Sequence, residues 1–199
     1  MNHILFSLAS ISIVLLLAAQ AIGLTVGDLY ARPQPAEDTL QWATVHRLTG
    51  FTAALGVVFV ESIVVTYFIG TSRWCREVVE TYRLDPADVR ASNQLKRRTF
   101  PWALVGMLAV IGVAALGAAA DPGRTNPLNA RAWADWHLVG SFIGIAIIAW
   151  TYVVAWNNVS ANHAIIERLM GEVARIRRER GLDAGPAALQ TSKSPATRS

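Results

Sequence analysis

Four long apolar blocks, almost free of charge, dominate this sequence and limit what it can fold into. They cover approximately residues 4–26, 44–69, 101–120 and 136–156. A helix needs about 20 such residues to cross roughly 30 Å of hydrocarbon, because it rises about 1.5 Å per residue. Only 16% of the residues are charged, against about 25% in an ordinary soluble domain. The sequence therefore predicts an all-α integral membrane protein, a four-helix bundle.

The first block has one feature of a signal peptide, because Ala19-Gln20-Ala21 resembles a cleavage site. Two observations favour a retained helix instead. The n-region Met1-Asn2-His3 has no Lys or Arg, and the apolar run continues past the site to Val26. We expect this block to remain as the first span.

The basic residues gather in two places, which predicts the orientation. Segment 71–100 carries seven Lys and Arg residues, and the chain after Trp156 carries seven more. Since basic loops stay in the cytoplasm, we expect both termini and the 71–100 loop inside, with 27–43 and 121–135 outside. The expected location is a bacterial inner membrane. The formal charge of +4 then reflects topology, and no nucleic-acid partner is expected.

The segments on the basic side are predicted to be helical. Residues 73–83 are amphipathic, and a second short helix should follow Asp85-Pro86 and end before Pro101. With this loop, residues 1–158 form the expected membrane unit.

The chain after the fourth span is expected to continue as an amphipathic helix over 159–180. Its apolar stripe suits the membrane surface, the 71–100 loop or a partner, or else the helix simply extends the fourth span into water. The stripe consists of Ile166, Leu169, Val173 and Ile176. Segment 181–199 is rich in Gly, Ala, Pro, Ser and Thr and is predicted to be disordered.

A short motif occurs twice and suggests a tandem repeat of two-helix units. Trp42-Ala43-Thr44-Val45-His46 opens the second span, and Trp133-Ala134-Asp135-Trp136-His137 opens the fourth. Each copy follows an apolar helix and a Pro-containing outer loop. The pattern indicates two units in the same orientation.

His46 and His137 are the main functional candidates, because ionisable residues in a membrane span are costly. They should lie at the same depth near the outer face, on diagonal helices whose axes are about 11–14 Å apart. That gap suits a haem b with one axial imidazole from each side. Small residues below each histidine would leave space for the porphyrin: Gly50 and Ala53, then Gly140, Ser141 and Gly144. Alternatively, the histidines are structural and the small residues serve helix packing, or the pair binds another metal with oxygen ligands.

Glu61 is the second candidate. It lies about 22 Å deeper than His46 by helix rise, in the inner half of the bilayer. We interpret it either as a proton-handling or quinone-binding group or as a buried carboxyl hydrogen-bonded to neighbours such as Ser62, Thr66, Tyr67 or Tyr152. In the third span, Gly106, Gly112 and Gly117 are expected to provide close packing.

The general layout resembles that of four-helix membrane cytochromes b, with histidines on nonadjacent helices and glycine nearby. The best-known members hold two haems with four histidines, whereas this chain has one well-placed pair. The similarity is one of architecture, and no family motif can be laid over these residues. The histidine pair favours an electron-transfer subunit with one bis-histidine haem near the outer face, linked to a quinone and to other membrane or respiratory subunits. The alternative is a non-redox structural or assembly subunit of a larger membrane complex. No motif of a free-standing hydrolase is present.

Overall fold

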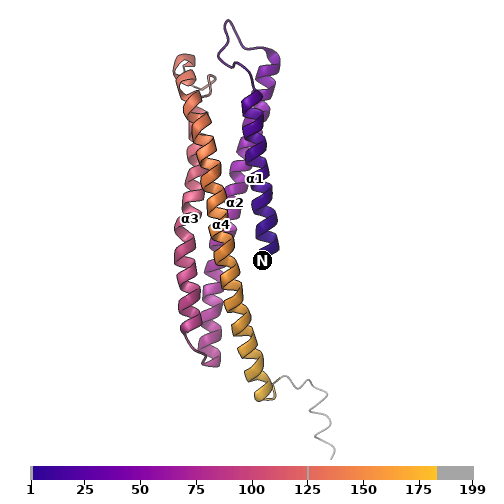
Figure 1. Cartoon of the computed structure of the whole chain (residues 1–199), viewed down its shortest axis with the longest axis vertical. Helices are drawn as coiled ribbons and strands as arrows, with labels where there is room; N and C mark the ends of the chain where they lie inside the picture. The colour runs from indigo at the N-terminus through magenta and orange to yellow at the C-terminus, as the bar shows by residue number, and fades with distance from the viewer. Residues whose placement is uncertain (1, 125, 183–199) are drawn as a thin grey trace, which may run out of the picture.

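The computed structural model describes residues 2–124 and 126–182 and consists of four long helices packed side by side (Figure 1). They are α1 (Asn2–Thr25), α2 (Glu37–Tyr82), α3 (Ala87–Ala119) and α4 (Pro127–Glu179). All four are long and apolar enough to cross a membrane. The prediction of an all-helical protein with four membrane-length helices is therefore confirmed.

Local sequence explains where the helices begin and end. Asn126 accepts a hydrogen bond from the Leu128 N–H at 3.0 Å, so it caps α4 with Pro127 at the first position. At the end of α2, Arg83 adopts the left-handed conformation with φ of 55°. The Leu84 N–H then donates to the Val79 carbonyl at 3.0 Å, which is the hydrogen bond of the Schellman motif that ends many helices. The sharp turn into α3 follows directly.

The helices follow one another around the bundle. α2 packs against both α1 and α3, and α3 packs most extensively against α4. α4 also meets α1 and, over a shorter contact, α2, while α1 and α3 stand apart on the long diagonal. α2 and α4 therefore face each other across the short diagonal.

One seam along α2 supplies a large share of the buried core. Its members recur every three or four residues, so they lie on one face of the helix; they are Ala53, Val57, Val60, Val64, Phe68, Cys75 and Val79. Val110 on α3 and Ile148 on α4 pack against the part of this seam between Ala53 and Phe68. Beyond it, Ile165 and Leu169 of α4 pack against Cys75 and Val79.

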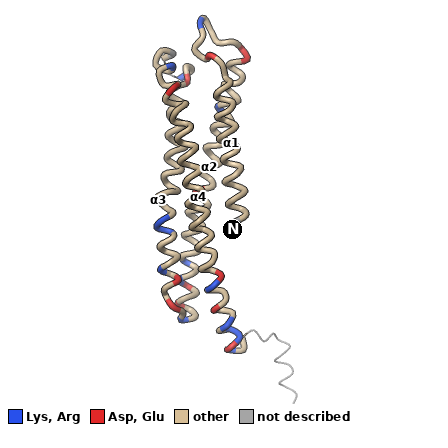
Figure 2. The backbone as a smooth tube through the Cα atoms, in the orientation of Figure 1, with Lys and Arg blue, Asp and Glu red and all other residues tan. Residues whose placement is uncertain are grey.

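Three of the helices continue past the expected bilayer at one end. At about 1.5 Å per residue, the 46 residues of α2 and 53 of α4 run well over twice the roughly 30 Å of hydrocarbon. The N-terminal end of α1 lies near the middle of the rod, so α1 does not extend along the rest of it (Figure 1). Charged residues gather at both ends and leave the middle without Lys or Arg (Figure 2). We call the extension beyond α1 the charged end, formed by residues 70–100 and 157–182.

The predicted short helix that ends before Pro101 is wrong. α3 runs through Pro101 without a break. Proline removes one backbone hydrogen bond, but Pro101 faces outward, while Thr99 and Ala103 on either side are each only 1% exposed. Packing of the flanking turns thus keeps the helix continuous.

The apolar stripe after the fourth span is part of one continuous α4. Its member Leu169 is 1% exposed and packs on Cys75 and Val79 of α2, with Ile166 beside it. These α2 residues belong to the segment that the sequence predicted as the 71–100 loop. The predicted disordered tail lies, from residue 183 on, outside the described residues.

Candidate functional site

The two histidines singled out in the sequence lie side by side. The ring centres of His46 on α2 and His137 on α4 are 6.1 Å apart, with 71° between their planes. Both side chains are half-buried near the end of the bundle that carries the 26–36 and 120–126 connections. The structure therefore brings this predicted pair together across the short diagonal.

A glycine on α1 fixes the orientation of His46. The Nδ1 atom lies 2.9 Å from the Ala19 carbonyl oxygen. A Cβ atom at Gly23, four residues later, would come within 2.8 Å of Cε1 of His46. In a helix, the carbonyl at position i lies beneath residue i+4, so the missing side chain at Gly23 exposes the Ala19 carbonyl to the imidazole.

His137 has an equivalent surrounding on α3. A Cβ atom at Gly117 would come within 3.0 Å of its Cε1. Val113, four residues before Gly117, presents its carbonyl toward the ring, although Nδ1 forms no hydrogen bond of standard geometry with a described residue. Each histidine thus packs on a glycine of the preceding helix, an arrangement that sequence analysis missed.

The predicted small residues have different surroundings. A side chain at Gly50 would meet nothing within 4 Å, whereas Gly140 and Gly144 are covered by Leu116 and Val113 of α3. Ala53 is fully buried. Ser141 donates its hydroxyl to the Leu138 carbonyl at 2.7 Å. Only Gly50 therefore adjoins open space, and the two α4 glycines instead let α3 approach.

The donor set around the pair is small. In the described ranges, no group of three or more His, Cys, Asp or Glu side chains could hold a metal ion. The acidic residues that the sequence predicts on the same side, Asp28, Glu37, Asp38 and Asp135, form no such group with the two histidines. Among the described residues, the two imidazoles are therefore the protein ligands available at this position.

An ion pair closes the bundle beside the histidines. Arg47 Nη1 lies 2.8 Å from Oδ2 of Asp121 and joins α2 to the connection after α3. The Gly123 N–H donates to Asp121 Oδ1 at 2.9 Å. Partial burial raises the pKa of Asp121, but the Gly123 hydrogen bond and the Arg47 guanidinium outweigh it, so the pKa lies below its ordinary value.

Glu61 lies in the core where three helices meet. It is fully buried, and its Oε1 accepts the Thr151 hydroxyl of α4 at 2.7 Å. A Cβ at Gly106 of α3 would come within 2.5 Å of the same oxygen. Oε2 has no partner among the described residues, nor has the buried Tyr152 hydroxyl on α4. The sequence located the carboxyl but missed Thr151 as its partner.

A second buried polar cluster lies toward the charged end. Asn162 of α4 is fully buried and accepts the Ser92 hydroxyl at 2.8 Å. Its amide donates to Tyr67 at 3.2 Å and Thr71 at 3.1 Å. Four side chains from three helices thus form one network, which we call the Asn162 network. No sequence signal singled it out, since a lone Asn after a span resembles a surface residue.

Comparisons of the chain with protein-family models, with curated proteins and with solved structures find no match.

Proposed function

We propose that this chain is a cytochrome b-like electron-transfer subunit that holds one haem b between His46 and His137. The distance between the two rings carries the proposal. An imidazole nitrogen binds a metal at about 2 Å, and the ring centre lies roughly 1 Å further. Two axial imidazoles on opposite sides of one iron therefore have ring centres about 6 Å apart, and the observed separation is 6.1 Å.

The number of ligands favours haem over a bare ion. Protein zinc sites use three or four protein ligands, and no such group surrounds the pair in the part of the chain that the structure describes. A haem would need only the His46 and His137 imidazoles from the protein, because the porphyrin supplies the other iron ligands. The open space at Gly50 is where the macrocycle would need room beside α2.

The carbonyl contact supports the same role. Histidines that ligate a metal usually donate the other ring N–H to a carbonyl or carboxylate, which fixes the tautomer. If the His46 Nδ1–H donates to Ala19, Nε2 is the free ligating atom. The bound haem would supply one-electron chemistry, and the chain's residues would hold it and set its potential through such hydrogen bonds.

The orientation and the repeat belong to this proposal. Gly23 with His46 and Gly117 with His137 make the same contact in each half, which supports a tandem pair of two-helix units. The basic charged end would lie in the cytoplasm of a bacterium, with both termini inside and the haem near the outer face. Partners would be a quinone and other membrane or respiratory subunits.

Glu61 is proposed to handle protons or to bind a quinone. Its Oε2 has no hydrogen-bond partner among the described residues, and neither has the Tyr152 hydroxyl, so hydrogen-bonding capacity remains beside the Thr151 contact. Polar groups buried without partners are costly and point to function. Glu61→Gln keeps the Thr151 contact and removes the titration, so the protein should fold and retain haem but lose proton- or quinone-linked turnover. Unchanged turnover between pH 5 and 9 would reduce Glu61 to a packing residue.

The test of the haem site is an oxidised-minus-reduced absorption spectrum of the full chain expressed with haem precursor. We expect a six-coordinate, low-spin haem at one per chain. His46→Ala or His137→Ala should remove or destabilise it, while the matched change His163→Ala should not, because His163 pairs with Glu167 at the charged end. A colourless wild-type protein would overturn the proposal and favour a structural subunit. An unchanged spectrum in the double variant would overturn the ligand assignment.

A further inference from the structure

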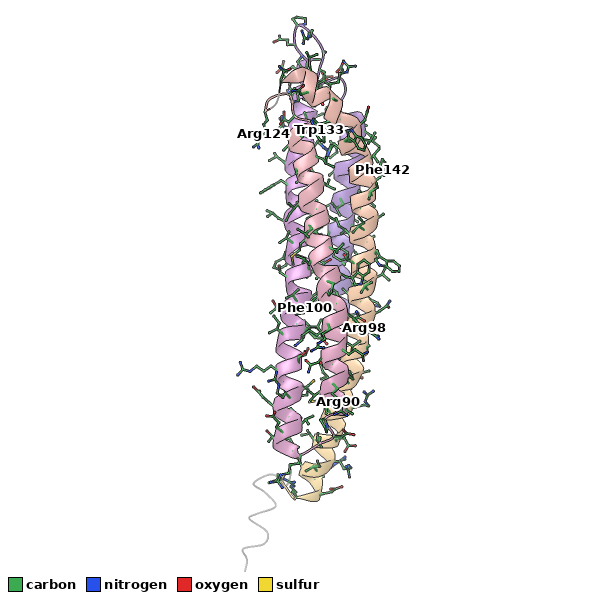
Figure 3. The ribbon with its side chains drawn as sticks, turned by 90° about the vertical axis from the view of Figure 1, so that its left-hand side faces the viewer. Arg90, Arg98, Phe100, Arg124, Trp133 and Phe142 are labelled. Carbon is green, nitrogen blue, oxygen red and sulfur yellow. The ribbon has the colours of Figure 1, made fainter. Side chains whose placement is uncertain are left out.

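A groove of about 500 Å³ lies between α2 and α3 where the apolar part of the bundle gives way to the charged end. Ile69 of α2 and Phe100 of α3 line its apolar part. The basic side chains of Arg73, Arg76 and Lys96 line the rest, together with Ser72, Glu77 and Glu80. Figure 3 shows Phe100 at the seam between the two helices.

Two of the cations in the groove have no counter-ion among the described residues. Arg73 is neutralised by Glu77, with Nε and Oε1 2.9 Å apart. Arg76 and the half-buried Lys96 form no ion pair with a described residue. Glu80 is exposed one helical turn beyond Arg76, further from the apolar part. The groove therefore offers two cations, one from each helix, to an anion.

The floor of the groove also has an unsatisfied polar group. Ser72 lines it and is only 2% exposed, and its hydroxyl has no hydrogen-bond partner among the described residues. Buried hydroxyls normally find a partner. The site is thus built for something polar at this depth, next to an apolar wall.

The order of these side chains along the helices matches an amphiphile. On α2, Arg76 lies about 10 Å beyond Ile69 by helix rise, and on α3, Lys96 lies about 6 Å beyond Phe100 in the same direction. The apolar residues are on the membrane side and the cations on the water side. Basic pockets between membrane helices are where anionic lipid head groups bind.

We propose that this groove binds one anionic phospholipid, with its phosphate between Arg76 and Lys96 and the start of an acyl chain on Ile69 and Phe100. Such a lipid would join α2 to α3 at the membrane surface, where α1 no longer supports them. This inference is independent of the haem proposal, since it uses neither the histidines nor Glu61.

The experiment measures the thermal midpoint of the purified full-length protein in neutral detergent, titrated with phosphatidylglycerol or with phosphatidylcholine of the same acyl chains. Phosphatidylglycerol should raise the midpoint saturably, with one lipid retained per chain in native mass spectrometry. Arg76→Gln and Lys96→Gln should each weaken this binding about fivefold, since one cation near an anionic lipid contributes on that scale.

Arg98→Gln is the matched control, because it removes the same charge from the same helix. Arg98 lies two residues from Phe100, on the opposite face of α3 and on the side nearer α4 (Figure 3), so binding should not change. Equal binding of phosphatidylcholine, equal loss in Arg98→Gln, or the same midpoint shift from inorganic phosphate alone would overturn the proposal.

Discussion

At the scale of single residues, the same close contact between a glycine and an imidazole occurs twice in this protein. Gly23 meets His46 and Gly117 meets His137, in both cases at the Cε1 edge of the ring. A helix carbonyl is normally covered by the side chain four residues later. Gly23 at that place lets the His46 imidazole reach the Ala19 carbonyl, and Gly117 gives the His137 ring the same space on α3, so both glycines act as positioning residues.

This arrangement gives a direct prediction for Gly23→Ala and Gly117→Ala. The added methyl group would come within 2.8 and 3.0 Å of the ring, so each imidazole must turn or move. Because changes in the groups that orient a metal-binding histidine typically reduce affinity 10- to 100-fold, we expect haem affinity to fall about tenfold or more. Haem titration of the purified variants measures it.

The control for that prediction is Gly112→Ala on α3, where a methyl group would meet nothing within 4 Å. It should bind haem like the wild type. If Gly117→Ala also binds normally, or if both alanine variants on α3 lose haem equally, the glycine is not a positioning residue. The environment of the histidine rings can also be followed by NMR without haem, so failure to bind haem does not hide the effect.

The sequence predicted the two histidines as site residues but not the glycines that contact them. His46 and His137 were predictable because a charged or titratable group in an apolar block is conspicuous, and both follow the same W-A-x-x-H pattern. Gly23 was not predictable, since a glycine in an apolar helix also fits simple packing. Of the three glycines expected to pack closely in the third span, Gly106 and Gly117 do, whereas Gly112 faces open space. Helix phase alone did not separate them.

At the scale of elements, α2 and α4 are longer than a membrane span requires, because each continues into the charged end. The apolar seam of α2 continues from Phe68 to Cys75 and Val79, and the Asn162 network joins α2 between these two parts of the seam, through Tyr67 and Thr71. The burial of Thr99 and Ala103 on either side of Pro101 explains why α3 stays helical there, where the sequence predicted a break. Sequence rules account for the missing N–H of proline, but they do not include the packing of the helical turns on either side of it.

The Asn162 network should be important for stability. Asn162→Leu would leave the Ser92, Tyr67 and Thr71 hydroxyls without their shared partner, and an unsatisfied buried group costs about 1–3 kcal/mol. For a chain of this size, that corresponds to a fall of several degrees in the thermal midpoint. The exposed Asn157 provides the control, since Asn157→Leu should change the midpoint little. Equal effects of the two changes would contradict a structural role for the network.

The Arg47–Asp121 pair should make stability depend on pH in the acid range. The pKa of Asp121 is lowered in the folded protein, so its contribution is present above its ordinary pKa of 3.8 and is lost as the pH falls through the lower folded value. Asp121→Asn should therefore be less stable than the wild type at pH 7, by at most about 1 kcal/mol because Arg47 is half-exposed. Thermal midpoints measured from pH 7 to pH 3 should converge. A constant gap would mean that the carboxylate charge is not responsible.

At the scale of the whole molecule, charge is distributed along the rod rather than around it. Many large apolar side chains of the middle are exposed, while Lys and Arg lie toward the two ends (Figure 2). The end with the 26–36 and 120–126 connections carries few cations, and the charged end carries most of them. This asymmetry was fully readable from the sequence, because apolar length and the count of Lys and Arg need no knowledge of packing. The sequence did not predict which side chains contact each other inside the rod. Those contacts depend on how each helix is rotated about its axis, and helices that are apolar on all sides give no signal for it.

The asymmetry predicts how the protein inserts. A reporter that is active only in the cytoplasm should be active when fused after Ser199, and a reporter that is active only outside should be active when inserted near Pro127. Each position should receive both reporters, so that every active fusion has an inactive counterpart. The physical reason is that 14 of the 18 Lys and Arg residues lie in 71–100 or after Trp156, and such segments resist translocation. The opposite pattern would place His46 and His137 near the cytoplasmic face, and activity of both reporters at one position would indicate insertion in two orientations.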